Sequence, residues 1–158
     1  MIQRVQTIFL FLVAVAMGLT IGMELWLQVV PDSSETYTLS AFSMQHLSSS
    51  GEVLSSNSTW YLAALAAFVG FLAIISIFQY RSRARQMMIN MINSLFMVGI
   101  VVIVFLTTSG VNTEIGAADN GTYKIGFWAI LVAMVCNMLA NRFIKKDEAL
   151  VKSVDRIR

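Results

Sequence analysis

The chain has 158 residues, of which 57% are hydrophobic and only 13% are charged. Soluble domains carry about a quarter charged residues, so this composition excludes an ordinary soluble domain and predicts a protein that lives in the lipid bilayer. The formal net charge is only +2, and the single cysteine, Cys136, excludes an intramolecular disulfide.

Four apolar runs reach the length of a transmembrane helix, at residues 5–27, 60–79, 87–108 and 124–143. Lipid offers the backbone no hydrogen-bond partner, so each run is predicted to be a helix. The first run resembles a signal peptide, because Arg4 precedes apolar residues and an A-x-A pattern at Ala14 to Ala16. Its apolar sequence continues to Met23, however, which favours a retained transmembrane helix.

These runs predict an all-α membrane protein with one domain over residues 1–158. The expected fold is an antiparallel four-helix transmembrane bundle with an extended first outer loop and a C-terminal amphipathic helical tail. The first outer loop, at 28–59, is rich in serine and contains Pro31 and Gly51, which favours irregular structure. Tyr37 to Ala41 alternates polar and apolar residues like a strand, but the alternation breaks at Phe42. The other segments are a cytoplasmic loop at 80–86, a second outer loop at 109–123 and a tail at 144–158.

The distribution of charge predicts the orientation of the bundle. Ten of the eleven basic residues fall at the N-terminal end, in the loop at 80–86, or from Arg142 to the end of the chain, and only Lys124 falls on the other side. Because basic residues stay in the cytoplasm, both termini are predicted to be cytoplasmic. Trp26, Trp60 and Trp128 fall near the outer helix ends, where indoles favour the boundary between lipid and water.

Four asparagines are predicted to form a polar layer inside the membrane. Asn90 and Asn93 lie three residues apart in the third run, and Asn137 and Asn141 lie four apart in the fourth. Each pair shares a helix face near the cytoplasmic side, so the two pairs are expected to meet. One interpretation is that their hydrogen bonds hold the helices together, and the other is a pocket for a lipid headgroup or small solute.

Small residues are the candidates for close helix contact. Gly18 and Gly22 form a G-x-x-x-G pattern, and Ala66 with Gly70 repeats the same spacing in the second run. Contact within the bundle and contact between chains are both compatible with this pattern.

The tail places four apolar side chains at helical spacing between basic residues. It is expected to lie on anionic lipid, to dock a protein partner, or to be a charged extension of the last helix. The four residues are Phe143, Leu150, Val154 and Ile157.

Both ends of the chain resemble one protein family. The opening MIQRVQT (Met1 to Thr7) and the ending KDEALVKSVDRIR (Lys146 to Arg158) are similar to the ends of small four-span proteins of Bacteroidota, catalogued as a domain of unknown function. This resemblance implies a bacterial inner membrane and the same four-span layout. It implies no activity and no catalytic residues.

The leading functional interpretation is a non-catalytic inner-membrane protein that serves as an accessory or scaffold subunit of a membrane assembly. The alternative is a small transporter or a lipid- or solute-binding membrane protein. We expect no enzyme activity, because the sequence contains no nucleophile with its base, and no metal, because the only histidine, His46, is alone in a loop. Expected partners are bilayer lipid, anionic lipid, and a membrane protein or second copy, with no cofactor and no nucleic acid.

Overall fold

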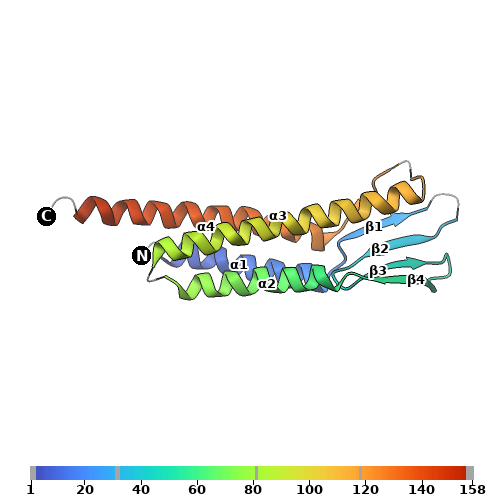
Figure 1. Cartoon of the computed structure of the whole chain (residues 1–158), viewed down its shortest axis with the longest axis horizontal. Coiled ribbons are helices and arrows are strands. Elements are labelled where there is room, and N and C mark those ends of the chain that lie inside the picture. The colour runs from blue at the N-terminus through green and yellow to red at the C-terminus, as the bar shows by residue number, and fades with distance from the viewer. Residues whose placement is uncertain (1–2, 31–32, 81, 118, 156–158) are drawn as a thin grey trace.

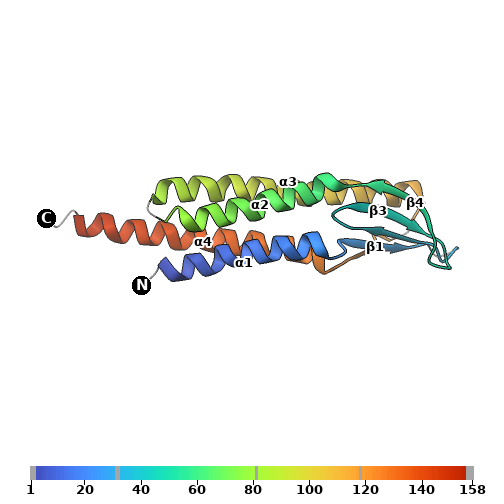
Figure 2. The ribbon, with the colours of Figure 1, turned by 90° about the horizontal axis from the view of Figure 1, so that it is seen from below.

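The computed structural model describes residues 3–30, 33–80, 82–117 and 119–155, with side chains described between residues 5 and 149. Its helices lie side by side along the long axis of the molecule, and a small β-sheet lies at one end (Figures 1 and 2). We call this the sheet end, and the opposite end, where α1 begins and α4 ends, the termini end. The helices are α1 (Gln3–Gly22), α2 (Trp60–Phe78), α3 (Arg83–Glu114) and α4 (Ile125–Asp155).

The four helices predicted from the apolar runs are confirmed. In the described part of the chain, four helices are long and apolar enough to cross a membrane: Val5–Gly22, Trp60–Phe78, Arg83–Glu114 and Ile125–Ala149. The chain is therefore a membrane protein. Helix α1 packs against α2 and α4, and α3 packs against the same two helices. Fully buried apolar side chains from all four helices fill the centre, including Val13, Val69, Ile100 and Ile130.

The sheet corrects the all-α prediction. Five antiparallel strands lie in the order β4-β3-β2-β1-β5. Strands β2, β3 and β4 lie in the first outer loop, which was expected to be irregular, and β5 comes from the second. Strand β1 begins within the predicted first helix and continues into the first outer loop. The strand expected from Tyr37 overlaps β2. The strands are β1 (Trp26–Val29), β2 (Thr36–Leu39), β3 (Ser43–Leu47), β4 (Val53–Ser58) and β5 (Thr122–Tyr123).

The sheet is joined to the helical core by one apolar face. Trp26 pairs with Leu39 across β1 and β2, and Leu39 pairs with Met44 across β2 and β3. All three side chains are buried and belong to the same cluster as the bundle core. Because successive side chains of a strand point to opposite faces, this register places them on one face of the sheet.

The prediction that Trp26 sits at the lipid boundary was wrong. The indole is fully buried, and its Nε1 donates a hydrogen bond of 2.8 Å to the carbonyl oxygen of Asn120. The run 5–27 was read as one helix, but α1 ends at Gly22 and the residues after Leu25 pair with β2. Trp60 and Trp128 are exposed, as expected of side chains at the lipid boundary.

Helices α3 and α4 are longer than the apolar runs that identified them. The 32 residues of α3 span roughly 48 Å, more than the roughly 30 Å of bilayer hydrocarbon. Its last turns extend beside the sheet, where the hydroxyl groups of Thr108 and Tyr123 lie 3.3 Å apart (Figure 1). Helix α4 continues without a break to Asp155, so the predicted tail helix is an extension of the fourth transmembrane helix.

Candidate functional site

The predicted polar layer exists and connects three helices. Asn90, Asn137 and Ser76 are all fully buried. The Asn137 amide nitrogen on α4 donates to the Asn90 carbonyl oxygen at 2.8 Å and to the Ser94 hydroxyl at 2.7 Å, both on α3. The Ser76 hydroxyl on α2 donates to the Asn90 side-chain oxygen at 2.6 Å. These hydrogen bonds fix α2, α3 and α4 relative to one another near the termini end.

The four asparagines do not all pair as expected. Asn93 is fully buried, yet neither its amide oxygen nor its amide nitrogen has a hydrogen-bond partner among the described residues. Asn141 is half-buried, and its Oδ1 also lacks a partner there. A buried amide atom without a partner costs free energy, and of these two residues Asn141 lines cavities that a polar group can enter.

Sequence reasoning missed two contributions to this layer. The Gln86 side chain is buried and its Nε2 donates to the Ser76 carbonyl oxygen at 2.9 Å, which ties the start of α3 to the end of α2. Arg83 on α3 forms an ion pair of 3.2 Å with Asp147 on α4, and both side chains are largely buried. Gln86 and Asn90 lie four residues apart and therefore share a helix face, and this spacing could have identified Gln86 as a member of the layer.

The candidate helix-contact residues divide into two groups. Ala66 is fully buried, and a Cβ added to Gly70 would lie 3.5 Å from the Met17 side chain, so this pair lies at the contact of α2 with α1. A Cβ at Gly18 or Gly22 would meet no atom within 4 Å. In the described structure the side-chain position of each of these glycines is therefore open, and both glycines are exposed.

The tail residues are placed only in part. Phe143 stacks on Phe9 of α1, with ring centroids 5.6 Å apart, so it belongs to the contact of α1 with α4. The side chains of Leu150 and Val154, and the whole of Ile157, lie outside the described residues. Of the four residues of the predicted apolar stripe, the structure therefore places the side chain of Phe143 alone, and it lies inside the bundle.

The free edge of β4 is the feature that sequence reasoning missed entirely. Strand β4 pairs with β3, and all six of its side chains are exposed. The Thr59 N–H donates to the Phe42 carbonyl oxygen at 2.9 Å. Because backbone groups alternate between the two edges of a strand, residues 55 and 57 bond toward β3 and Ser56 directs its N–H and carbonyl away from the sheet. No alternation of polar and apolar residues marks this strand, so the sequence carried no signal for it.

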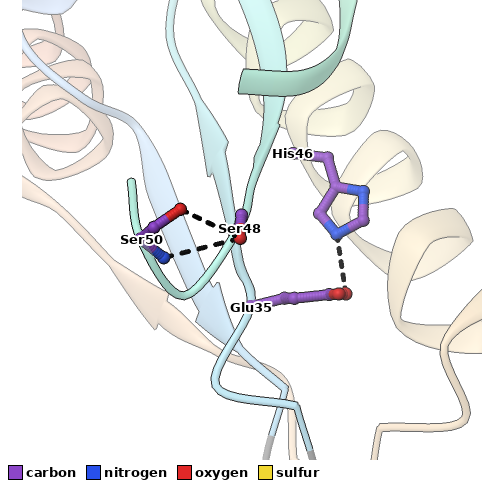
Figure 3. Close-up of polar contacts among 4 residues, drawn as sticks. All are labelled: Glu35, His46, Ser48 and Ser50. Carbon is purple, nitrogen blue, oxygen red and sulfur yellow. Dashed lines mark hydrogen bonds and ion pairs between the residues drawn. The ribbon is translucent and has the colours of Figure 1, made fainter. Parts of the chain in front are cut away.

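One end of the sheet carries a compact polar group (Figure 3). The His46 ring stacks on Tyr37 with centroids 4.2 Å apart, and its Nε2 lies 2.9 Å from a Glu35 carboxylate oxygen. Burial, together with the negative charges of Glu35 and Glu114, raises the pKa of the Tyr37 hydroxyl. Within the described residues, no group of three His, Cys, Asp or Glu side chains could hold a metal ion.

The family model described as "Domain of unknown function (DUF4293)" matches residues 2–157. The chain belongs to this family. The match covers nearly the whole length, so the four helices and the sheet together make up the DUF4293 domain. No curated protein matches the chain. The polar layer near the termini end and the free edge of β4 at the sheet end are two candidate sites of this DUF4293 domain.

Proposed function

We propose that the protein is a non-catalytic accessory or scaffold subunit of a bacterial inner-membrane assembly, and that it binds its partner protein by pairing a strand with the free edge of β4. Both termini are cytoplasmic in this proposal, and the sheet lies on the outer side of the membrane. The opposite charge of the two ends supports this orientation: Arg83, Arg85, Lys145 and Lys146 lie at the termini end, with Glu35, Glu52, Glu114 and Asp119 at the sheet end.

The observation that carries the proposal is an unprotected sheet edge. Strand β4 has the sequence VLSSNS, with no charged residue and no proline, and Val53 and Leu54 are both more than half exposed. Proteins usually protect such edges with lysine, proline or a very short strand, because a free edge pairs with any compatible strand. The other edge of this sheet follows that rule, since β5 has only two residues. One edge of the sheet is therefore short, whereas the β4 edge is long and open, and this difference favours a role for β4 in binding another strand.

Geometry favours a different protein over a second copy of this chain. Figures 1 and 2 show the strands running roughly along the same axis as the transmembrane helices. Two copies in one membrane would be related by a two-fold axis perpendicular to the bilayer. That axis places each backbone N–H of β4 opposite the same N–H of the other copy, where it finds no acceptor. A partner's strand has no such restriction on register or direction.

The distribution of polar side chains supports a scaffold over a transporter. A transport path needs polar or charged side chains through the full thickness of the membrane. The polar layer ends near Asn93 and Ser94, and the next buried side chains of α3 toward the sheet end are Met97, Ile100 and Val104, none of which is exposed to solvent. Among the buried residues described in α3, the three between Asn93 and Thr108 are all apolar, which favours a packing role over a continuous transport path.

A single substitution tests this proposal. Ser56→Pro removes the N–H that points away from the sheet and leaves the bonds between β3 and β4 intact. We expect the wild-type protein, purified in a mild detergent from its native cells, to carry a stoichiometric partner protein, and Ser56→Pro to lose it. Ser56→Ala keeps the N–H and is expected to retain the partner. Circular dichroism and the melting temperature establish that both variants are folded.

Two results would contradict this assignment. If the wild-type protein purifies alone at physiological expression level, it has no stoichiometric partner. If the folded Ser56→Pro variant keeps the same partner at the same stoichiometry, the partner does not bind at the edge of β4.

A further inference from the structure

We propose that the groove between α3 and α4 at the termini end binds the headgroup of an anionic phospholipid. Two adjoining cavities of about 340 and 350 Å³ lie along this groove, and they share Asn141 and Lys145 as lining residues. The first is also lined by Ser94, Met138 and Arg142, and the second by Met87, Met88 and Met91.

The groove supplies two free cations for a phosphate. Arg142 and Lys145 lie three residues apart on α4, so they share a helix face, and both side chains are exposed. Neither forms an ion pair with a carboxylate among the described residues, whereas Arg83 at the same end is paired with Asp147. A guanidinium and an ammonium placed together match the charge and the oxygen acceptors of a phosphodiester.

Polar groups of the buried layer form the inner side of the groove. The Ser94 hydroxyl lines it while it accepts a hydrogen bond from Asn137. Asn141 lines both cavities, and its buried Oδ1 has no hydrogen-bond partner in the described chain. A hydroxyl of a glycerol headgroup would donate a hydrogen bond to this oxygen.

The apolar part of the groove distinguishes a lipid from a soluble phosphate. Met88, Met91 and Met138 are each more than 60% exposed, on the surface that faces the bilayer. A free phosphate would leave these side chains unused, whereas the acyl chains of a lipid would pack against them. Methionine is flexible and adapts to irregular chains.

The depth of the groove fits a headgroup. Arg142 and Lys145 lie where the apolar part of α4 ends, at the level of the phosphates, and the methionines lie toward the centre of the membrane. With the proposed orientation, this is the cytoplasmic leaflet. The site lies at the opposite end of the molecule from β4, so its failure and the failure of the partner assignment are separate results.

Native mass spectrometry of the delipidated full-length protein in detergent tests the site. We expect phosphatidylglycerol to bind at least ten-fold more tightly than phosphatidylcholine. The double variant Arg142→Gln/Lys145→Gln should lower the affinity for phosphatidylglycerol at least ten-fold. The control Arg85→Gln/Lys146→Gln removes two exposed cations from the same end, outside the groove, and should lower it less than three-fold.

Three results would overturn the proposal. If the wild-type protein binds phosphatidylglycerol and phosphatidylcholine with equal affinity, the groove has no preference for an anionic headgroup. This result does not depend on whether the variants fold. Equal losses in the two double variants show attraction by general charge without a site. Displacement of phosphatidylglycerol by inorganic phosphate at millimolar concentration shows a site for a soluble anion.

Discussion

The four asparagines of the polar layer differ in what each one contributes. Asn137 makes two hydrogen bonds between α4 and α3, and Asn90 accepts from both Ser76 and Asn137. Asn93, one turn along α3 from Asn90, is equally buried and makes none within the described residues. Spacing placed these residues in one layer, but only the rotation of each helix about its own axis decides which amide meets which.

This difference predicts opposite effects of the same substitution. Asn137→Leu should destabilise the protein by about 1 to 2 kcal/mol, because two hydrogen bonds are lost and the Asn90 carbonyl loses an interhelical donor. Asn93→Leu should leave stability unchanged or raise it, because a buried amide without partners is replaced by an apolar side chain. Thermal unfolding in detergent, followed by circular dichroism, measures both.

A double variant of Asn137 and Ser94 tests whether the stability effects of these two residues are coupled. Asn137→Leu and Ser94→Ala share a hydrogen bond, so their combined loss should be smaller than the sum of the single losses. Strong coupling between Asn93 and Asn137 would contradict this assignment, because it would show that the Asn93 amide interacts with the layer.

At the scale of the elements, glycine has different roles in α1 and α4. A Cβ at Gly126, at the start of α4, would lie 2.7 Å from the Glu24 carbonyl oxygen and 2.9 Å from that of Met23. These carbonyls belong to the short connection between α1 and β1, and Gly126 donates its own N–H to Glu24 at 3.0 Å. The start of α4 is therefore fitted against the backbone that turns α1 into the sheet.

We expect Gly126→Ala to destabilise the protein by about 1 to 3 kcal/mol, because the added methyl group has no space beside the backbone. Gly18→Ala, where the Cβ meets nothing, should be neutral or slightly stabilising, since alanine favours a helix over glycine. Melting temperatures in the same detergent give the comparison. An equal loss in Gly18→Ala would indicate that this face of α1 contacts another chain.

The helices could be predicted from the sequence and the sheet could not, for a physical reason. A run such as 60–79 contains no charged residue, and the membrane leaves a single secondary structure open to it. In β4 the apolar Val53 and Leu54 are followed by four polar residues, and β5 has two residues, so neither carries a periodic signal. The pairing of β5 depends on contacts distant in sequence, such as Trp26 with Tyr123. The same dependence placed Trp26 in the core when its position suggested the lipid boundary.

The orientation that we propose for the whole molecule gives a direct prediction. In a Cys136→Ser background, Ser50→Cys introduces a cysteine in the exposed turn before β4, and Ala84→Cys introduces one on the exposed first turn of α3. An impermeant thiol reagent applied to intact spheroplasts should label Ser50→Cys only. Ala84→Cys should react after the membrane is permeabilised. The reverse pattern would place the sheet in the cytoplasm.

The connection between β4 and α2 restricts the partner that we propose for the protein. Only Thr59 separates the two elements, and its backbone and side chain are bonded to Phe42 and Ser40, so the strand enters the membrane helix without a flexible joint. Six residues of extended strand cover roughly 20 Å. A complementary strand must therefore lie within that height of the bilayer surface. This geometry selects a juxtamembrane segment, next to the membrane anchor of its own protein, over a freely diffusing one.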